Sequence, residues 1–286
     1  MKQRLQCLLP ILRVHSWGGY GSQLYSAYIV LRIQSRFPGR RIKVIIHTSG
    51  VTRRKAEFNF DALRVKSVQR DDYRESSINT LSTNRNLASL HLRTRVLKGF
   101  LLSLLETSKL LQYSNDEKSF NAIKPWTVAL RGHYTKLALV PATVESLYEF
   151  LFRNNVPDDS KSLVIHYRLG DLLYIKNKGP IDITRVEQIA QKIPVGPKVP
   201  LLLSDSVGDE LTNFLRQSKV LSNCEFANYE PLATLNTCID SENFIGSNAK
   251  LSLWAAIFRY HVFQKESFLP RELDWSIKLG LKSNWY

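Results

Sequence analysis

The chain has 286 residues, of which 44% are hydrophobic and 23% charged. This is enough for one large or two smaller folded domains and excludes a disordered or low-complexity protein. Its three cysteines, Cys7, Cys224 and Cys238, have unrelated spacings and form no CxxC pair, so a disulfide framework and a structural zinc site are disfavoured and a reducing compartment is favoured.

The formal net charge of +15 is concentrated in the first half of the chain. Residues 1–150 contain 24 lysines and arginines against 10 carboxylates, a net of +14, whereas residues 151–286 contain 16 against 15, a net of +1. The first carboxylate is Glu57. This asymmetry indicates an anionic partner for the first half (nucleic acid, an acidic lipid surface or a phosphorylated substrate), and a solvated basic surface is the alternative.

No targeting or membrane-spanning segment is evident in the sequence. The apolar run that ends at Leu12 is short and is interrupted by Pro10, which does not suit the core of a signal peptide. No later apolar run has the length of a membrane span. We therefore expect a cytoplasmic protein, with peripheral contact to the acidic inner face of the membrane as a further expectation from its charge.

The first elements predict a βαβ unit. A short apolar run predicts a strand over residues 4–12, and glycines predict a turn at 17–21. A helical pattern over 22–34 is followed by a second strand over 41–47. A strand, a turn, a helix and a strand in this order predict a parallel sheet.

Two further helices are predicted before the middle of the chain, over 86–112 and 141–153. The first has a leucine stripe at helical spacing, which favours a core helix with solvated charges over a helix on a membrane surface. The stripe consists of Leu90, Leu97, Leu101, Leu104 and Leu105.

A polar, proline-containing stretch at 154–160 is the best linker candidate. After it, strands and helices alternate again, which predicts a second domain with ligands at the carboxyl ends of its strands. We expect domains at 1–157 and 158–286. The second has predicted strands over 162–167, 199–204, 224–227 and 244–246, and predicted helices over 183–193, 209–217, 231–238 and 251–260.

Four strand-to-helix turns contain candidate binding residues. The first contains Gly18, Gly19, Gly21 and Gln23. Its glycines allow a ligand to approach the backbone at a helix N-terminus, although a tight turn explains them equally well. With Leu24 at the third glycine position, the turn lacks the GxGxxG dinucleotide fingerprint, and it also lacks the GK[ST] of a P-loop.

The second turn, at 166–171, has the sequence His-Tyr-Arg-Leu-Gly-Asp. Strand alternation places His166 and Arg168 on one face, and the guanidinium fork suits a diphosphate. A pairing of Arg168 with Asp171 and a core role for His166 are equally compatible with the pattern. In the third turn, Asp205 either accepts hydrogen bonds from a base or ribose or caps a helix.

The fourth turn begins a helix with the residues Gly246, Ser247, Asn248 and, four residues later, Ser252. Hydroxyls, an amide and backbone N–H groups at the positive end of a helix can bind phosphate. A plain helix cap at Asn248 is the alternative.

In this order, the four turns resemble the motifs of the bacterial α-1,2-fucosyltransferases and, more distantly, of the α-1,6- and protein O-fucosyltransferases. The matching motifs are Gly-Gly-x-Gly-x-Gln at 18–23, His-x-Arg-x-Gly-Asp at 166–171, Ser-Asp at 204–205 and Ser-Asn-x-x-x-Ser-x-Trp-Ala-Ala at 247–256. The resemblance therefore spans most of the chain. The chain departs from the family at Tyr20, Ser22 and 249–251, which bears on the donor sugar and acceptor more than on the fold.

The resemblance implies an α/β fold of the GT-B glycosyltransferase type, with two Rossmann-like domains facing a cleft. It implies metal-independent, inverting transfer of fucose from GDP-fucose to a glycan or lipid-linked glycan in surface polysaccharide or O-antigen synthesis. It further implies that Arg168 neutralises the β-phosphate, His166 helps hold the nucleotide and Asp205 contacts the base or ribose. The remaining donor-binding residues would be Ser247, Asn248 and Ser252 at the phosphates, with Gly18, Gly19, Gly21 and Gln23 closing from the other domain.

We expect no metal ion and no cofactor apart from the nucleotide-sugar donor. Fixed cations and backbone dipoles can stabilise a leaving diphosphate without a metal, and the acidic pairs at 71–72 and 158–159 are in loop-like stretches. An inverting reaction also needs a base for the acceptor proton. Asp171 is the nearest carboxylate in the motifs, so it joins Arg168 as a candidate catalytic residue, with a structural cap as its alternative role.

Three other functions are alternatives to this one. The same fold with another donor, such as a UDP-sugar, is the nearest. A basic nucleic-acid-binding protein is suggested by the charge, but no helix-turn-helix, zinc or aromatic-interleaved basic pattern is present, and we expect no nucleic acid partner. An NAD-dependent enzyme is disfavoured because the dinucleotide fingerprint is missing.

Overall fold

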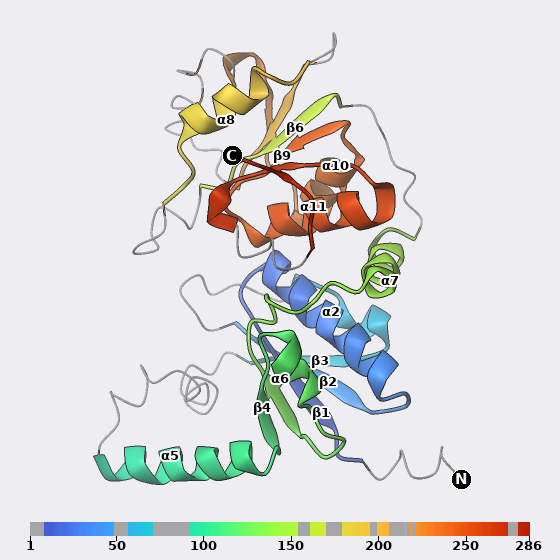
Figure 1. Cartoon of the computed structure of the whole chain (residues 1–286), viewed down its shortest axis with the longest axis vertical. Coiled ribbons are helices and arrows are strands. Elements are labelled where there is room, and N and C mark those ends of the chain that lie inside the picture. Colours follow the sequence, from blue (N-terminus) through green and yellow to red (C-terminus); the bar gives the residue numbers. More distant parts are fainter. Residues whose placement is uncertain are drawn as a thin grey trace. The chain divides into compact units, whose positions relative to one another are not determined.

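The computed structural model describes residues 9–48, 57–70, 92–153, 161–169, 179–194, 199–205, 215, 218, 221–273 and 280–286. The chain divides into two compact units, Met1–Ala138 and Leu139–Tyr286. Each unit contains a sheet whose described strands all pair in parallel (Figure 1). Parallel strands require crossover connections, and helices supply several of them in each unit. The predicted α/β fold with two Rossmann-like units is confirmed.

The sheet of the first unit has the strand order β3-β2-β1-β5-β4. Its central strands, β1 and β2, pair in register from Leu12 with Ile42 to Trp17 with His47. Helix α2 is buried along most of its length and is joined to α6 by an Arg32–Glu117 ion pair of 2.8 Å. The elements of this unit are β1 (Leu12–Trp17), α2 (Tyr20–Arg36), β2 (Ile42–His47), η1 (Phe60–Leu63), β3 (Lys66–Arg70), α5 (Leu92–Thr107), β4 (Leu111–Tyr113), α6 (Glu117–Asn121) and β5 (Ala129–Arg131).

The sheet of the second unit has the strand order β11-β10-β9-β6-β7-β8. Counted from β6, this is the 3-2-1-4-5-6 order of doubly wound dinucleotide-binding folds, with the order reversing between β6 and β9. The elements are α7 (Pro141–Phe152), β6 (Leu163–His166), α8 (Ile183–Ala190), β7 (Leu201–Leu203), η3 (Leu221–Asn223), β8 (Glu225–Ala227), α10 (Pro231–Asp240), β9 (Asn243–Ile245), α11 (Lys250–Phe263), β10 (Phe268–Leu269) and β11 (Asn284–Trp285).

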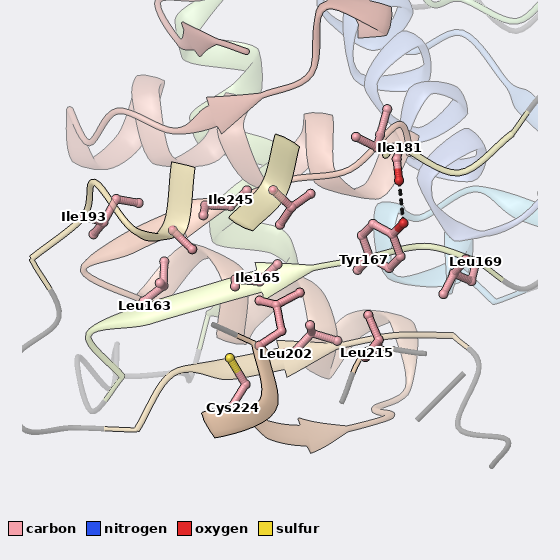
Figure 2. Packing of buried hydrophobic residues seen from close by; sticks show 13 residues of the cluster. Leu163, Ile165, Tyr167, Leu169, Ile181, Ile193, Leu202, Leu215, Cys224 and Ile245 are labelled. Atoms are coloured by element: carbon pink, nitrogen blue, oxygen red, sulfur yellow. Dashed lines mark hydrogen bonds between the residues drawn. The ribbon is translucent and has the colours of Figure 1, made fainter. Parts of the chain in front are cut away.

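Strand β6 is buried on both faces because it is central in the sheet. Alternate residues, Leu163, Ile165 and Tyr167, contribute to one apolar cluster, which Figure 2 shows from close by. The Tyr167 hydroxyl in this cluster donates a hydrogen bond to the carbonyl of Ile181. Because side chains alternate along a strand, His166 and Arg168 belong to the opposite face.

The boundary between the units precedes α7, earlier than the predicted boundary after residue 157. The predicted helix at 141–153 is confirmed as α7, but it packs on α11 of the second unit. Tyr148 contacts both Phe258 and Phe263 of α11, with ring centroids 5.7 and 5.2 Å apart. These aromatic contacts explain why α7 belongs to the second unit. The linker predicted at 154–160 lies outside the described residues.

The first described strand, β1, begins at Leu12, where the predicted strand at 4–12 ends. Residues 9–11 are not in a strand, and the rest of the predicted strand lies outside the described residues. The predicted strand stopped before the polar residues His15 and Ser16, which belong to β1. Both are buried with polar partners, since Ser16 accepts a hydrogen bond from Ser26 (2.8 Å) and His15 contacts His47. Burial of polar side chains is tolerated where they are hydrogen-bonded.

The helix predicted at 86–112 ends earlier in the structure, and its assignment to the core is wrong. Helix α5 covers Leu92–Thr107, while Leu111–Tyr113 forms β4. Four of the five stripe leucines, those at 97, 101, 104 and 105, are exposed, and Leu90 lies outside the described residues. The helix predicted at 209–217 also falls almost entirely outside them.

Candidate binding site at the carboxyl edge of the second sheet

The candidate site is at the carboxyl edge of the second sheet, where the strand order reverses between β6 and β9. Ligands of doubly wound sheets bind at this position. Arg168 follows β6, Asp205 follows the neighbouring β7, and Ser247 and Asn248 follow β9. The structure thus brings together the described candidate residues of the last three sequence turns, which come from three adjacent strands.

A chain of hydrogen bonds joins His166 to the backbone of Arg168. His166 Nδ1 lies 2.7 Å from Ser252 Oγ, and Ser252 Oγ accepts the Ser247 N–H at 3.0 Å. Ser247 Oγ in turn accepts the Arg168 N–H at 3.1 Å. His166, Ser247 and Ser252 are all buried. The network therefore fixes the start of α11 against the end of β6, directly below the point where the Arg168 side chain leaves the backbone.

Burial lowers the pKa of His166 to about 4; the neighbouring Asp205 opposes this shift and Arg168 adds to it. At neutral pH the imidazole is therefore uncharged. In one tautomer, Nδ1 of the neutral imidazole donates a hydrogen bond to the Ser252 hydroxyl, and in the other tautomer it accepts one. His166 is buried and contacts Ser252, so it supports the residues of the site from below and is not exposed on the site's surface.

Arg168 and Asp205 form the accessible part of the site. Asp205 Oδ1 accepts the Leu169 N–H at 2.9 Å, while its Oδ2 lies 3.8 Å from Arg168 Nε. The two side chains are 26% and 30% exposed. Because the aspartate contacts Nε at long range, the guanidinium is oriented by a carboxylate while part of its surface remains accessible to an anion.

The start of α11 completes the site. Gly246 is closely surrounded, since an added Cβ would lie 2.7 Å from Leu269 Cδ2 and 2.8 Å from Ser252 Cβ. The Tyr286 hydroxyl donates to the Gly246 carbonyl at 2.7 Å. Asn248 is half-buried. The N-cap residue of α11 is Ala249, whose side chain makes no capping hydrogen bond to the helix. The first N–H groups of a helix lack intrahelical partners and favour anions.

Asp171, the candidate base, lies outside the described residues, as does Gly170 of the same motif. Its role therefore stays a prediction. Within the described part of the chain, the carboxylate next to Arg168 is Asp205, which the sequence analysis had assigned to the base or ribose. That assignment also stays a prediction.

In the first unit, the glycine turn joins β1 to α2. Gly18 has a φ of +83°, in the region that favours glycine, and an added Cβ would lie 2.9 Å from Ser22 Oγ. Gln23 is buried. Its amide donates to the Gly18 carbonyl at 3.0 Å and accepts the N–H groups of Glu57 and Phe58 at 3.0 and 2.9 Å. These bonds fix the turn against the segment before η1.

The other two glycines of this turn have backbone roles at the start of α2. Gly19 is the N-cap, and its carbonyl accepts the N–H groups of Ser22 and Gln23. Gly21 is buried within the first turn of the helix. The turn is at the carboxyl end of β1, where the strand order of the first sheet also changes. The part of these residues in donor binding stays a prediction.

An aromatic stack at the same edge of the first sheet was not predicted from the sequence. His15, Trp17 and His47 stack with centroid distances of 4.8 to 5.9 Å, and His15 Nδ1 lies 2.9 Å from His47 Nε2. Arg131, at the end of β5, is also buried, and burial lowers its pKa to about 10. The i, i+2 spacing of His15 and Trp17 is the signal that could have indicated a shared strand face.

Among the described residues, no group of three or more His, Cys, Asp or Glu side chains is arranged to hold a metal ion. Cys224 and Cys238 are free and buried, and burial raises the pKa of both thiols. Protonated, buried thiols are poor nucleophiles and poor metal ligands. The described groups at the site are a guanidinium, a carboxylate, hydroxyls, an amide and backbone N–H groups.

No family model and no curated protein matches the chain. Solved structures do. E. coli heptosyltransferase WaaC with ADP-2-deoxy-2-fluoro heptose is 8% identical, with 91% of this chain and 88% of that one covered and a TM-score of 0.44. A glycosyl transferase family 9 structure from Veillonella parvula is also 8% identical, with coverages of 91% and 80% and a TM-score of 0.46. At such values the similarity is no evidence for an activity, and the α/β fold follows from the strand orders described above.

Proposed function

We propose that this chain is a glycosyltransferase that takes a sugar from a nucleotide-diphosphate donor, with GDP-fucose as the favoured donor. The observation that supports the proposal most directly is the position of Arg168. Its backbone is held by Ser247 and its side chain is oriented by Asp205 at the point of strand-order reversal. A partly exposed guanidinium beside a helix N-terminus suits a diphosphate.

In the proposed reaction, an acceptor hydroxyl attacks the anomeric carbon from the face opposite the leaving group. The bond between that carbon and the β-phosphate oxygen breaks, and the nucleoside diphosphate leaves with the electron pair. Negative charge therefore grows on the β-phosphate in the transition state. Arg168 and the N–H groups at the start of α11 stabilise this charge, because fixed dipoles and cations need no reorganisation during the reaction.

The attacking hydroxyl must also lose its proton to a base. Asp171 keeps this role in the proposal, since it follows Arg168 closely in the chain. The product then has an inverted anomeric configuration, because a single displacement occurs at the carbon.

His166 acts as a positioning residue in this scheme. It is buried and uncharged, and its contact is with Ser252. Through Ser252 and Ser247 it fixes the backbone N–H of Arg168. Asn248, which is half-buried at the start of α11, is the better candidate for a direct phosphate contact, because an amide N–H can reach an oxygen that the buried serines cannot.

The proposed acceptor is a glycan or lipid-linked glycan used in surface polysaccharide or O-antigen synthesis. This part of the proposal rests on the resemblance of the four motifs. The same proposal gives the glycine turn at Gly18, in the first unit, a part in donor binding. The basic first half of the chain, with a net charge of +14, suits an acceptor that has a diphosphate or is presented at an anionic surface.

A thermal-shift panel tests the donor class. The full chain is heated with GDP, UDP, CDP, ADP and their sugars, since a ligand that binds only the folded state raises its melting temperature. Stabilisation by GDP and GDP-fucose supports the favoured donor. A response to UDP or ADP alone removes fucose and leaves a glycosyltransferase with another donor. No response to any nucleotide, together with stabilisation by an oligonucleotide, supports the nucleic-acid-binding alternative.

A further inference from the structure

Helix α5 has an exposed apolar face. Six large apolar side chains along it are between 36% and 67% exposed. They form two neighbouring rows at i, i+4 spacing, one with Val96, Phe100 and Leu104 and the other with Leu97, Leu101 and Leu105. Monomeric soluble proteins rarely expose a contiguous apolar patch of this kind without a binding role. We call these six residues the α5 face.

The opposite side of α5 attaches the helix to its unit. Leu102 is buried and clusters with Leu111 of β4 and Ala129 of β5. On a helix, position 102 lies opposite the row of Val96, Phe100 and Leu104, and it borders the row that contains Leu105. Figure 1 shows α5 beside β4 at one end, with most of its length projecting from the other described elements of the unit. The row of Val96, Phe100 and Leu104 therefore points away from the attachment at Leu102. An exposed flank of this kind suits a broad surface rather than a small ligand.

The positive charge of this region favours an anionic partner for the α5 face. The first half of α5 contains Arg93, Arg95 and Lys98, whereas its single carboxylate is Glu106 in the last turn. Residues 1–150 as a whole have a net charge of +14. Two copies of this chain that met through the α5 face would bring two strongly positive surfaces together, which disfavours self-association. An anionic surface is complementary to the charge and, if it is a bilayer, also to the apolar side chains.

We propose that the α5 face docks this protein on anionic lipid bilayers, with the helix lying in the plane of the interface. Its 16 residues span about 24 Å at 1.5 Å per residue. Among the described residues no helix has the length and hydrophobicity needed to cross a bilayer. A helix with large apolar side chains on one flank and basic residues nearby inserts that flank at the boundary between headgroups and acyl chains. Lipid phosphates then neutralise the lysine and arginines.

The test is co-sedimentation of the full chain with vesicles of phosphatidylcholine alone and of phosphatidylcholine with phosphatidylglycerol. We expect binding to the anionic vesicles that weakens as salt is raised. The variant Phe100→Ser/Leu104→Ser removes two apolar side chains from one row. Because burial of each such side chain is worth about a factor of ten or more, loss of the two should lower the partition coefficient by about a hundredfold or more.

The matched control is Leu232→Ser. Leu232 is an exposed leucine on α10 of the second unit, 41% exposed, so this variant should bind like the wild type. Circular dichroism and melting temperature should match the wild type for both serine variants, because Phe100, Leu104 and Leu232 are exposed. A second variant, Arg93→Gln/Arg95→Gln/Lys98→Gln, should lose binding to anionic vesicles and most of its salt dependence.

Three results would overturn the proposal. The first is the absence of binding to anionic vesicles at low salt. The second is binding that the Phe100→Ser/Leu104→Ser variant leaves unchanged, which would assign it to charge elsewhere in the first half. The third is a dimer in light scattering that the same variant converts to a monomer, which would make a second copy the occupant of the α5 face. None of these readouts requires a nucleotide, so the result is independent of the proposed transferase function.

Discussion

His166 Nδ1 lies 2.7 Å from Ser252 Oγ, and both side chains are buried between the end of β6 and the start of α11. This contact connects strand and helix at the point where a ligand of a doubly wound sheet is bound. A buried imidazole in this position must stay neutral, because the charged form would lose its hydration. Protonation of His166 should therefore loosen the strand end that holds Arg168.

The first prediction concerns stability at acid pH. The pKa of His166 is lowered to about 4 in the folded chain from its ordinary value of 6.5. Between these values the unfolded chain binds the proton and the folded chain does not, so stability is complete above pH 6.5 and falls as the pH falls towards 4. The loss should reach about 3 kcal/mol, measured as the free energy of unfolding in urea.

His166→Gln supplies the control, because glutamine keeps hydrogen-bonding capacity without titrating in this range. Its unfolding free energy should fall less steeply between pH 6.5 and 4 than that of the wild type. His261→Gln, at a half-exposed histidine whose pKa burial also lowers, should keep most of the wild-type slope. An unchanged slope in His166→Gln would show that another group is responsible.

A second prediction concerns Gly246, whose missing side chain allows α11 to begin close to the sheet. In Gly246→Ala, the new Cβ would collide with Leu269 and Ser252, so the start of α11 must move. We expect a loss of about 1–3 kcal/mol in unfolding free energy, the usual scale of overpacking, together with weaker nucleotide binding. Gly179→Ala is the control, since an added Cβ there contacts nothing within 4 Å. If a folded Gly246→Ala protein bound nucleotide as tightly as the wild type, Gly246 would not be needed for the site.

A third prediction concerns Arg259, a buried arginine of α11 that caps the end of α10. Its guanidinium donates to backbone carbonyls of the α10 C-terminus, which lack intrahelical partners. Arg259→Met keeps an apolar stem but leaves these carbonyls buried without their donor, and we expect a loss of about 3–5 kcal/mol. The accepting groups include the carbonyls of Cys238, Ile239, Ser241, Glu242 and Glu266.

Lys161→Gln is the comparison for Arg259→Met. Lys161 forms an ion pair of 2.7 Å with Glu225, and both side chains are substantially exposed. Exposed pairs contribute about 1 kcal/mol or less, so this variant should be nearly as stable as the wild type in urea. Equal stability of the two variants would mean that water molecules replace the Arg259 guanidinium as hydrogen-bond donors to the α10 carbonyls.

A fourth prediction concerns metal dependence. If Arg168 and the α11 N–H groups balance the charge of the leaving diphosphate, sugar transfer should continue in EDTA at a rate close to that without it. Turnover is measured by release of the nucleoside diphosphate. Loss of turnover that magnesium or manganese restores would show that a metal ion performs this role.

The elements that were predicted correctly are those that depend on residues close together in the sequence. Strand β6 and the turn after it were predicted because an apolar run followed by His166, Arg168 and glycine is a local pattern. Strands β4 and β5 were not predicted, since β4 begins inside the stretch that was predicted as a helix and β5 depends on its pairing with β1 and β4. Helix α5 was misassigned because a leucine stripe does not reveal whether another element covers it.

The same distinction applies to the site. Arg168, Asp205 and Ser247 were identified from their places after strands, and the parallel sheet brings them together as predicted for carboxyl ends. The hydrogen bond from the Leu169 N–H to Asp205 and the support of Arg168 by Ser247 could not be predicted, because they depend on the order of β7, β6 and β9 in the sheet. The stack of His15, Trp17 and His47 was missed for the same reason.

The fifth prediction concerns Arg168 itself and two substitutions of it. Arg168→Lys keeps the charge but loses the fork, while Arg168→Ala loses both. Turnover should fall by about 10² to 10³ in the alanine variant, with lysine between alanine and wild type. Because Arg168 is partly exposed and its contact with Asp205 is long, the melting temperature should change little. If Arg168 serves mainly to neutralise Asp205, alanine should instead destabilise the chain, and adding Asp205→Asn should restore its stability.

Calorimetric titration of nucleoside diphosphates into the wild type and Arg168→Ala tests the central claim most directly. The account predicts that one nucleoside diphosphate, GDP in the favoured case, binds the wild type. It also predicts that Arg168→Ala, folded to the same melting temperature, binds it about ten- to a hundredfold more weakly, the scale of a charge-assisted hydrogen-bonded contact. Equal affinities for the two proteins, or no binding of any nucleoside diphosphate to the wild type, would contradict it.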